Sequence, residues 1–313
     1  MDWHCLCVRP VGGGLVIDTL NWRWIFIVAA VPMIATVVLS LGLPSPDTGP
    51  VAVDYVGVAL GAVGLTATVF ALIEVPVLGP SHPAVAAALV AGLACIAAFV
   101  WWQLKAPSST VPLHLFTIRN FGVGNVMAVL YFGGVSMGTV VVVLFLQEVA
   151  GFSALQAGIA TLPWPMLSFV IASRVGALSA VVGPRVFVVV GPLVAALGFV
   201  LMRPDPAAFN FWSQMLPGLL LFGLGMAVTA TPLTATVLAA VASAHSGIGS
   251  AVNNAVSRVA ALFSIALIGI IASGALDYAS FRRLAIVAAA LMVTSSVVAA
   301  IGIRNPAEPH AVT

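Results

Sequence analysis

The chain has 313 residues, of which 62% are hydrophobic and only 6% are charged, and its mean hydropathy is +1.18. An ordinary globular domain has about 25% charged residues, so a water-soluble fold of this length lacks the charge to cover its surface. The net charge is only +2 and the basic residues are scattered, which excludes a nucleic-acid-binding stripe. The composition therefore predicts an all-α protein that crosses a lipid bilayer many times.

Apolar runs of about 20 residues, bounded by charges, prolines or glycines, predict about nine transmembrane helices. Five prolines within these runs are expected to interrupt spans: Pro163, Pro165, Pro192, Pro217 and Pro232. In chain order the expected spans cover residues 22–43, 55–75, 84–102, 121–145, 155–177, 186–202, 211–241, 248–273 and 284–303.

The sequence offers no pattern for a metal, a cofactor or catalysis. The cysteines are Cys5, Cys7 and Cys95, and no second pair follows the C-x-C to complete a zinc site. The glycine-bearing segments are apolar, and no Lys-Ser/Thr follows them as in a phosphate-binding loop. We expect no metal, no cofactor and no enzymatic activity, and a polytopic membrane enzyme is the weakest alternative.

Charged side chains within membrane helices cost about 3 kcal/mol each on insertion scales, so each one is a candidate functional residue. Glu74 and Glu148 are the acidic candidates for ion coupling, although both lie at span ends, where a solvated carboxylate is the simpler interpretation. Arg174 and Arg258 lie deeper and are candidates for coupling or gating. The alternative for Arg174 is a side chain that snorkels to the interface.

Polar and aromatic residues on the spans are candidates for a substrate cavity. Asn254 and Arg258 are four residues apart and share a helix face, which we expect to point into the bundle, for function or for bonding between helices. For the aromatic candidates, lipid contact or interfacial anchoring is the alternative. The candidate cavity residues are Asn125, Tyr131, Phe145, Trp164, Asn253 and Asn254.

Two neighbouring segments near the start carry a family resemblance. The segment "RPVGGG" precedes "IDTLNWRWIFIVAAVP", and this pairing resembles the fourteen-helix drug:proton antiporters of the major facilitator superfamily. In that family the fifth helix ends in G-P-x-x-G-G and a W-R-W-I/V-F entry to the sixth helix follows. Pro10, Gly13 and Gly14 fall on this antiporter motif, whereas Arg9 stands where the family has Gly.

Later segments agree with the same family in their order, among them "LFLQEVAGFSALQAGIATLPW" and "HSGIGSAVNNAVSRVAALFSIALIG". The loop expected at residues 176–185 resembles a degenerate copy of the family's cytoplasmic gating motif, in which Ala180 replaces the Asp. The family has four and a half helices before the antiporter motif, and only eight residues precede it here, so the resemblance implies a chain truncated at the N-terminus.

The resemblance implies a partial major facilitator fold divided into five parts. These are a stub of the fifth helix with an external loop (1–21), the sixth helix (22–43), two linker helices with a cytoplasmic loop (44–120), a C-terminal six-helix bundle (121–303) and a cytoplasmic tail (304–313). It also implies that Lys105, Arg119, Arg174, Arg185 and Arg304 lie near cytoplasmic ends.

The implied function is that of a secondary transporter, a proton-coupled multidrug efflux permease in a bacterial cell membrane. The expected partners are the lipid bilayer, small amphipathic or cationic solutes, and the proton as coupling ion. Because two bundles rock about a midplane site in such transporters, we expect this chain not to complete the cycle alone. Two alternatives remain: a non-transporting membrane remnant or interaction subunit that pairs with a separate N-terminal half, and a permease for another small solute.

Overall fold

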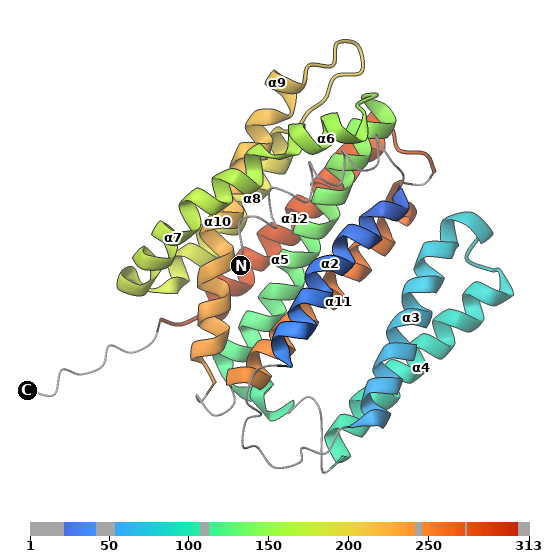
Figure 1. Ribbon diagram of the computed structural model, residues 1–313, viewed down its shortest axis with the longest axis vertical. Coiled ribbons are helices and arrows are strands. Elements are labelled where there is room, and N and C mark those ends of the chain that lie inside the picture. The colour runs from blue at the N-terminus through green and yellow to red at the C-terminus, as the bar shows by residue number, and fades with distance from the viewer. Residues whose placement is uncertain (1–21, 42–53, 107–112, 242–245, 273, 306–313) are drawn as a thin grey trace, which may run out of the picture.

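The computed structural model describes residues 22–41, 54–106, 113–241, 246–272 and 274–305, and this part of the chain is helical without a strand. The expected all-α membrane fold is confirmed, with eight described helices that are long and apolar enough to cross a bilayer (Figure 1). The expected first span corresponds to α2 (Trp22–Ser40), a helix of 19 residues that includes the apolar stretch Ala30–Leu39.

The eight spans follow the predicted order, and two of them are broken into two helices. They are α3 (Tyr55–Leu78), α4 (Pro83–Lys105), α5 (Arg119–Leu144) with the π-helical turn η2 (Phe145–Val149), α6 (Ala154–Thr161) with α7 (Pro163–Val182), α8 (Pro184–Leu201), α9 (Phe211–Gln214) with α10 (Leu216–Ala239), α11 (Ser246–Ala272) and α12 (Tyr278–Gly302). A short 3₁₀ helix, η1 (Leu113–Thr117), leads into α5.

Helix α5 lies at the centre of the packing and is the most buried of the described spans. It packs against α11 and α12, while α10 packs against α7 and α8, and α12 joins the two groups through α8. The α3–α4 hairpin lies beside α11, at the side of the bundle away from α7 (Figure 1). The bundle formed by α5 to α12 is therefore continuous, and the hairpin is attached to one flank of it.

Small residues allow the closest helix contacts, as expected for membrane helices. A Cβ atom built on Gly198 of α8 would lie 2.6 Å from the carbonyl oxygen of Gly218 on α10. The reverse holds as well, because a Cβ on Gly218 would lie 2.5 Å from the carbonyl oxygen of Gly198. The backbones of α8 and α10 thus touch directly at this crossing.

The five prolines do not all interrupt helices. Pro163 and Pro217 stand at the start of α7 and α10, and Pro165 lies in the first turn of α7, where the missing N–H costs nothing. The expectation is wrong for Pro192 and Pro232, which lie inside α8 and α10 while the helices continue through them. A membrane helix tolerates an internal proline because only one backbone hydrogen bond is lost and packing against neighbouring helices stabilises the remaining turns.

Glycines with positive φ set two of the turns. One of them is the turn between α3 and α4, where Gly79 has a φ of 86° and His82 caps α4. The expectation of a loop over residues 176–185 is wrong in extent, because α7 continues to Val182 and the chain turns at Gly183, where φ is 94°. The degenerate gating segment is therefore mostly helical.

Candidate functional site

The antiporter-motif residues lie outside the described part of the chain. Pro10, Gly13 and Gly14 all precede residue 22, where the description begins. Their role stays a prediction from the resemblance.

Asn125 and Asn253 are brought together in the core and join α5 to α11. The side-chain amide of Asn253 donates to Oδ1 of Asn125 over 3.2 Å, and the Asn125 amide in turn donates to the carbonyl of Phe121 over 2.9 Å. Both side chains are buried. An amide pair in this setting orients one helix against another, since each polar group would otherwise lie unsatisfied among apolar side chains.

Tyr131 lies farther along α5, with its side chain completely buried. Its hydroxyl donates to the carbonyl of Met226 on α10 over 3.5 Å. Tyr131 thus joins α5 to α10, as Asn125 joins α5 to α11. In this conformation neither side chain is open to a solute, so a solute would reach them only if these helices separated.

Asn254 and Arg258 are exposed, so the expectation that this face points into the bundle is wrong. Asn253 turns inward to Asn125, and its neighbour Asn254 therefore turns outward. Arg258 lies one turn farther along, close to the middle of α11. A charge at this depth is rare on a surface that meets only lipid, which marks the face as one that meets water or protein.

The two large aromatic candidates lie in packed clusters. Phe145 is completely buried, with its ring centroid 4.5 Å from that of Phe281 and 5.3 Å from that of Tyr278, and this cluster holds η2 against α12. Trp164 is partly buried, with its ring 5.5 Å from Phe222 of α10. Their proposed contact with a solute stays a prediction.

The remaining candidates for coupling or gating are more open. Glu148 is exposed in η2 and Arg174 is exposed on α7, while Glu74 is half-buried near the end of α3. None of the three forms a salt bridge among the described residues, so these side chains do not form a charge relay in the described part of the chain. Their roles stay predictions.

Sequence reasoning missed Asp54, a buried carboxylate at the start of α3. It accepts hydrogen bonds from the backbone N–H of Gly57 (2.7 Å), the indole N–H of Trp102 (2.9 Å) and the side-chain amide of Gln103 (2.8 Å). An aspartate directly before an apolar run signals a helix N-cap. The partners from α4 could not be anticipated, because they lie 48 and 49 residues away in the sequence.

Two cavities flank the bundle. One, of about 600 Å³, is almost wholly apolar and lies between the α3–α4 hairpin and helices α5 and α11, with Phe99, Phe116 and Phe263 in its wall. The other, of about 660 Å³, lies at the α7–α8 turn and is lined by Ser179 and Thr236 among others. None of the six candidate cavity residues lines either of these spaces.

Known transporters are similar to this chain in sequence. An uncharacterized MFS-type transporter, Rv1250 of Mycobacterium tuberculosis, is 29% identical over 266 residues, which are 83% of this chain and 45% of the relative. The cephamycin export protein CmcT of Amycolatopsis lactamdurans is 30% identical over 82% of this chain and 54% of its own length. The puromycin resistance protein pur8 of Streptomyces alboniger is 30% identical over 86% of this chain and 54% of its own length.

The chain resembles transporters of the major facilitator superfamily (MFS) over more than four fifths of its length. No family model matches it. The chain spans about half the length of the curated relatives it matches. With eight helices suited to crossing a bilayer and MFS transporters as relatives, it is a multi-pass protein of a bacterial cell membrane. In this chain, the outward face of α11 at Asn254 and Arg258 is the candidate functional site.

Proposed function

We propose that this chain forms part of an MFS secondary transporter that exports small amphipathic solutes and is driven by a proton gradient. The observation that carries the proposal is the exposed polar face of α11, where Asn254 and Arg258 lie near the middle of an apolar span. The drug-resistance and drug-export names of the relatives support the solute class.

The face of α11 has the mixed character that an amphipathic solute requires. Leu262 and Ile265 continue the face beyond Arg258 and are also exposed. A polar end followed by an apolar surface suits a solute that has a polar group and an apolar body. The amide pair between Asn253 and Asn125 holds α11 in the rotation that presents this face.

The charge of Arg258 refines the solute class. A guanidinium stays protonated at every physiological pH, so Arg258 attracts an acidic polar group and repels a cationic one. Among the amphipathic or cationic solutes expected from the sequence, the proposal therefore favours acidic and neutral amphiphiles. Arg258 cannot itself exchange a proton, so proton coupling requires a carboxylate, and Glu74 and Glu148 stay the candidates.

Solute binding tests the proposal directly. The purified chain is placed in lipid nanodiscs and titrated with an anionic amphipathic dye and with a cationic dye of similar size, followed by fluorescence polarisation. We expect the anionic dye to bind more tightly than the cationic dye. Its affinity should fall about five- to tenfold in Arg258→Gln and should be retained in Arg258→Lys. If neither dye binds, as for an interaction subunit, the proposal is contradicted. An unchanged affinity of Arg258→Gln for the anionic dye also contradicts it.

Coupling is tested in inverted membrane vesicles that contain the complete transporter of which this chain forms part. A proton-driven exporter accumulates the dye when the vesicle interior is made acidic, and an uncoupler abolishes this accumulation. Accumulation that persists in the presence of the uncoupler contradicts proton coupling.

A further inference from the structure

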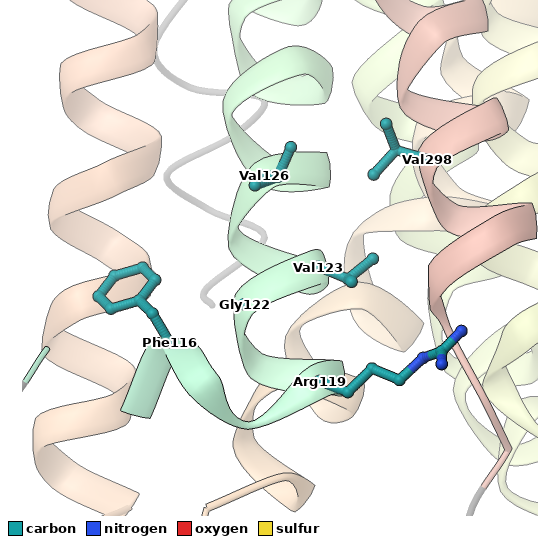
Figure 2. Close-up of a pocket in the computed structure, with 6 residues that line it drawn as sticks. All are labelled: Phe116, Arg119, Gly122, Val123, Val126 and Val298. Atoms are coloured by element: carbon teal, nitrogen blue, oxygen red, sulfur yellow. The ribbon is translucent and has the colours of Figure 1, made fainter. Parts of the chain in front are cut away.

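A shallow groove runs between α5 and α12 at one end of the bundle. Its volume is about 400 Å³, and its walls are almost entirely apolar. Figure 2 shows Val123 and Val126 on α5 beside Val298 on α12, with the Arg119 side chain directed toward the end of α12. The outer position of Val126, whose side chain is 53% exposed, opens the groove to the surroundings of the bundle.

Arg119 is fixed at the end of this groove by the last turn of α12. Its Nε donates to the carbonyl of Gly302 over 2.9 Å and its Nη2 donates to the carbonyl of Ile301 over 3.0 Å. These two bonds occupy only some of the N–H groups of the guanidinium, and the side chain is exposed. The groove therefore ends in a positioned cation that still has donors for an anion.

Positive charge gathers at this same end of the bundle. Lys105 ends α4, Arg185 begins α8 and Arg304 follows α12, and all three are exposed. Arg304 lies close to the groove, because its backbone exchanges two hydrogen bonds with the side chain of Asn120, the residue next to Arg119. Among the described residues, the one carboxylate at this end is Asp54, which is buried and bonded within the α3–α4 hairpin.

We propose that the groove binds an anionic phospholipid, with its phosphate on Arg119 and part of one acyl chain along Val123, Val126 and Val298. The guanidinium is suited to this role because its planar N–H donors match a phosphate group. The apolar walls provide the surface for the acyl chain, and the positive charges of Arg119 and the neighbouring Arg304 favour an anionic headgroup over a zwitterionic one, whose own ammonium group offsets its phosphate. This site lies apart from the exposed face of α11 and does not depend on solute binding there.

Competition between two lipids tests the site. The purified full chain is exchanged into an equal mixture of phosphatidylglycerol and phosphatidylcholine, and the lipids it retains are counted by native mass spectrometry. We expect about fivefold enrichment of phosphatidylglycerol in the retained lipid, the ratio that corresponds to about 1 kcal/mol for one arginine beside a headgroup with a net negative charge. Equal retention of the two lipids overturns the proposal.

Two arginine variants separate lipid binding from helix capping. Arg119→Gln is expected to remove most of the phosphatidylglycerol enrichment. Arg185→Gln is the matched control, because Arg185 also donates to the end of α12, at the carbonyl of Ala300 over 2.8 Å, but does not line the groove. The enrichment should persist in this control, and its equal loss in both variants overturns the assignment to Arg119.

A groove-filling variant leaves both arginines intact. Val126→Trp fills the groove two turns away from Arg119. Val190→Trp on α8 is its control, because the exposed fraction of Val190 is 44% and that of Val126 is 53%. We expect loss of enrichment in Val126→Trp alone, and retained enrichment there overturns the assignment to the groove. An excess of inorganic phosphate should not displace the lipid, and displacement would show a site for a free anion in place of a lipid.

Discussion

The side-chain amide of Asn253 on α11 donates a 3.2 Å hydrogen bond to Oδ1 of Asn125 on α5. This bond sets the rotation of α11 about its own axis, because both amides are buried among apolar side chains. Turning Asn253 inward turns Asn254 outward, and Arg258 follows on the same face one turn later. The candidate solute face is thus positioned by a pair of residues that themselves lie out of reach of solute.

Loss of this amide pair should destabilise the contact between α5 and α11. Asn253→Leu leaves Oδ1 of Asn125 without its donor from α11, and we expect the free energy of unfolding to fall by about 1 kcal/mol, the scale of hydrogen bonds between membrane helices. The measurement is denaturant-induced unfolding in detergent, with Asn125→Leu and the double variant completing a double-mutant cycle.

The neighbouring residue provides the control for this cycle. Asn254→Leu removes an exposed amide of the same type from the same helix, and its effect on stability should stay within about 0.5 kcal/mol. Equal losses in Asn253→Leu and Asn254→Leu would mean that the amide pair does not join the helices.

The crossing of α8 and α10 should tolerate no added methyl group. In Gly198→Ala the new Cβ would meet the carbonyl oxygen of Gly218 and the backbone nitrogen of Phe222, which are 2.6 and 2.7 Å from its position. Because these are backbone atoms, the helices must move apart, and we expect a loss of about 1–3 kcal/mol. Thermal unfolding in detergent measures it. Gly247→Ala, at a site with nothing within 4 Å, should cause no loss.

The membrane class and the order of the spans could be predicted from the sequence. A run of about 20 apolar residues between charges or turn residues matches the length of a helix that crosses the hydrocarbon core of a bilayer. The direction in which each helix faces could not. In a membrane helix the lipid-facing and core-facing sides are both apolar, so the periodicity that orients a helix in a soluble protein is weak. The spacing of Asn254 and Arg258 correctly placed them on one face but gave no sign that this face points outward.

The candidate site was predictable in residue type and only partly in arrangement. Asn125 and Asn253 stood out as amides in apolar spans, but their bond joins residues 128 positions apart. Asp54 lies at the start of a span, and the local sequence gives no sign of its bonds to Trp102 and Gln103 on the next helix. Pairing between distant helices depends on tertiary packing, which the local pattern of one chain does not contain.

The α3–α4 hairpin should depend on Asp54. Asp54→Ala removes the acceptor for Gly57, Trp102 and Gln103, and we expect a loss of about 2 kcal/mol from the missing cap and the lost side-chain bonds. The unfolding midpoint in detergent measures this loss. Asp205→Ala, which also removes a cap-like acceptor but at an exposed site, should cost less than about 0.5 kcal/mol. Matching losses would show that Asp54 does not hold the hairpin together.

Acid should weaken the start of α12. Hydrogen bonds from the side chain and the backbone N–H of Ser280 hold the pKa of the exposed Asp277 carboxyl below its ordinary value. The ionised cap therefore stabilises the folded protein fully at pH values above about 3.9, the pKa of an aspartate in the unfolded chain. This stabilisation is lost as the pH falls through the lower pKa that Asp277 has in the folded protein.

Asp277→Asn isolates this contribution, because asparagine caps a helix without titrating. The unfolding midpoint of the wild type should fall more between pH 6 and pH 3 than that of the variant. Identical pH dependence in the two proteins would exclude the role of the Asp277 carboxylate.

The most direct test of the proposed function is the chemical accessibility of the α11 face. In a variant without Cys5, Cys7 and Cys95, a single cysteine is introduced as Asn254→Cys, and as Leu197→Cys at an exposed apolar position of α8 for comparison. Each protein is treated in the membrane with a polar, membrane-impermeant thiol reagent. The account predicts rapid modification in Asn254→Cys, slowed by a saturating anionic amphiphile, and little modification in Leu197→Cys. Equally slow modification of both, or no protection by the amphiphile, would contradict it.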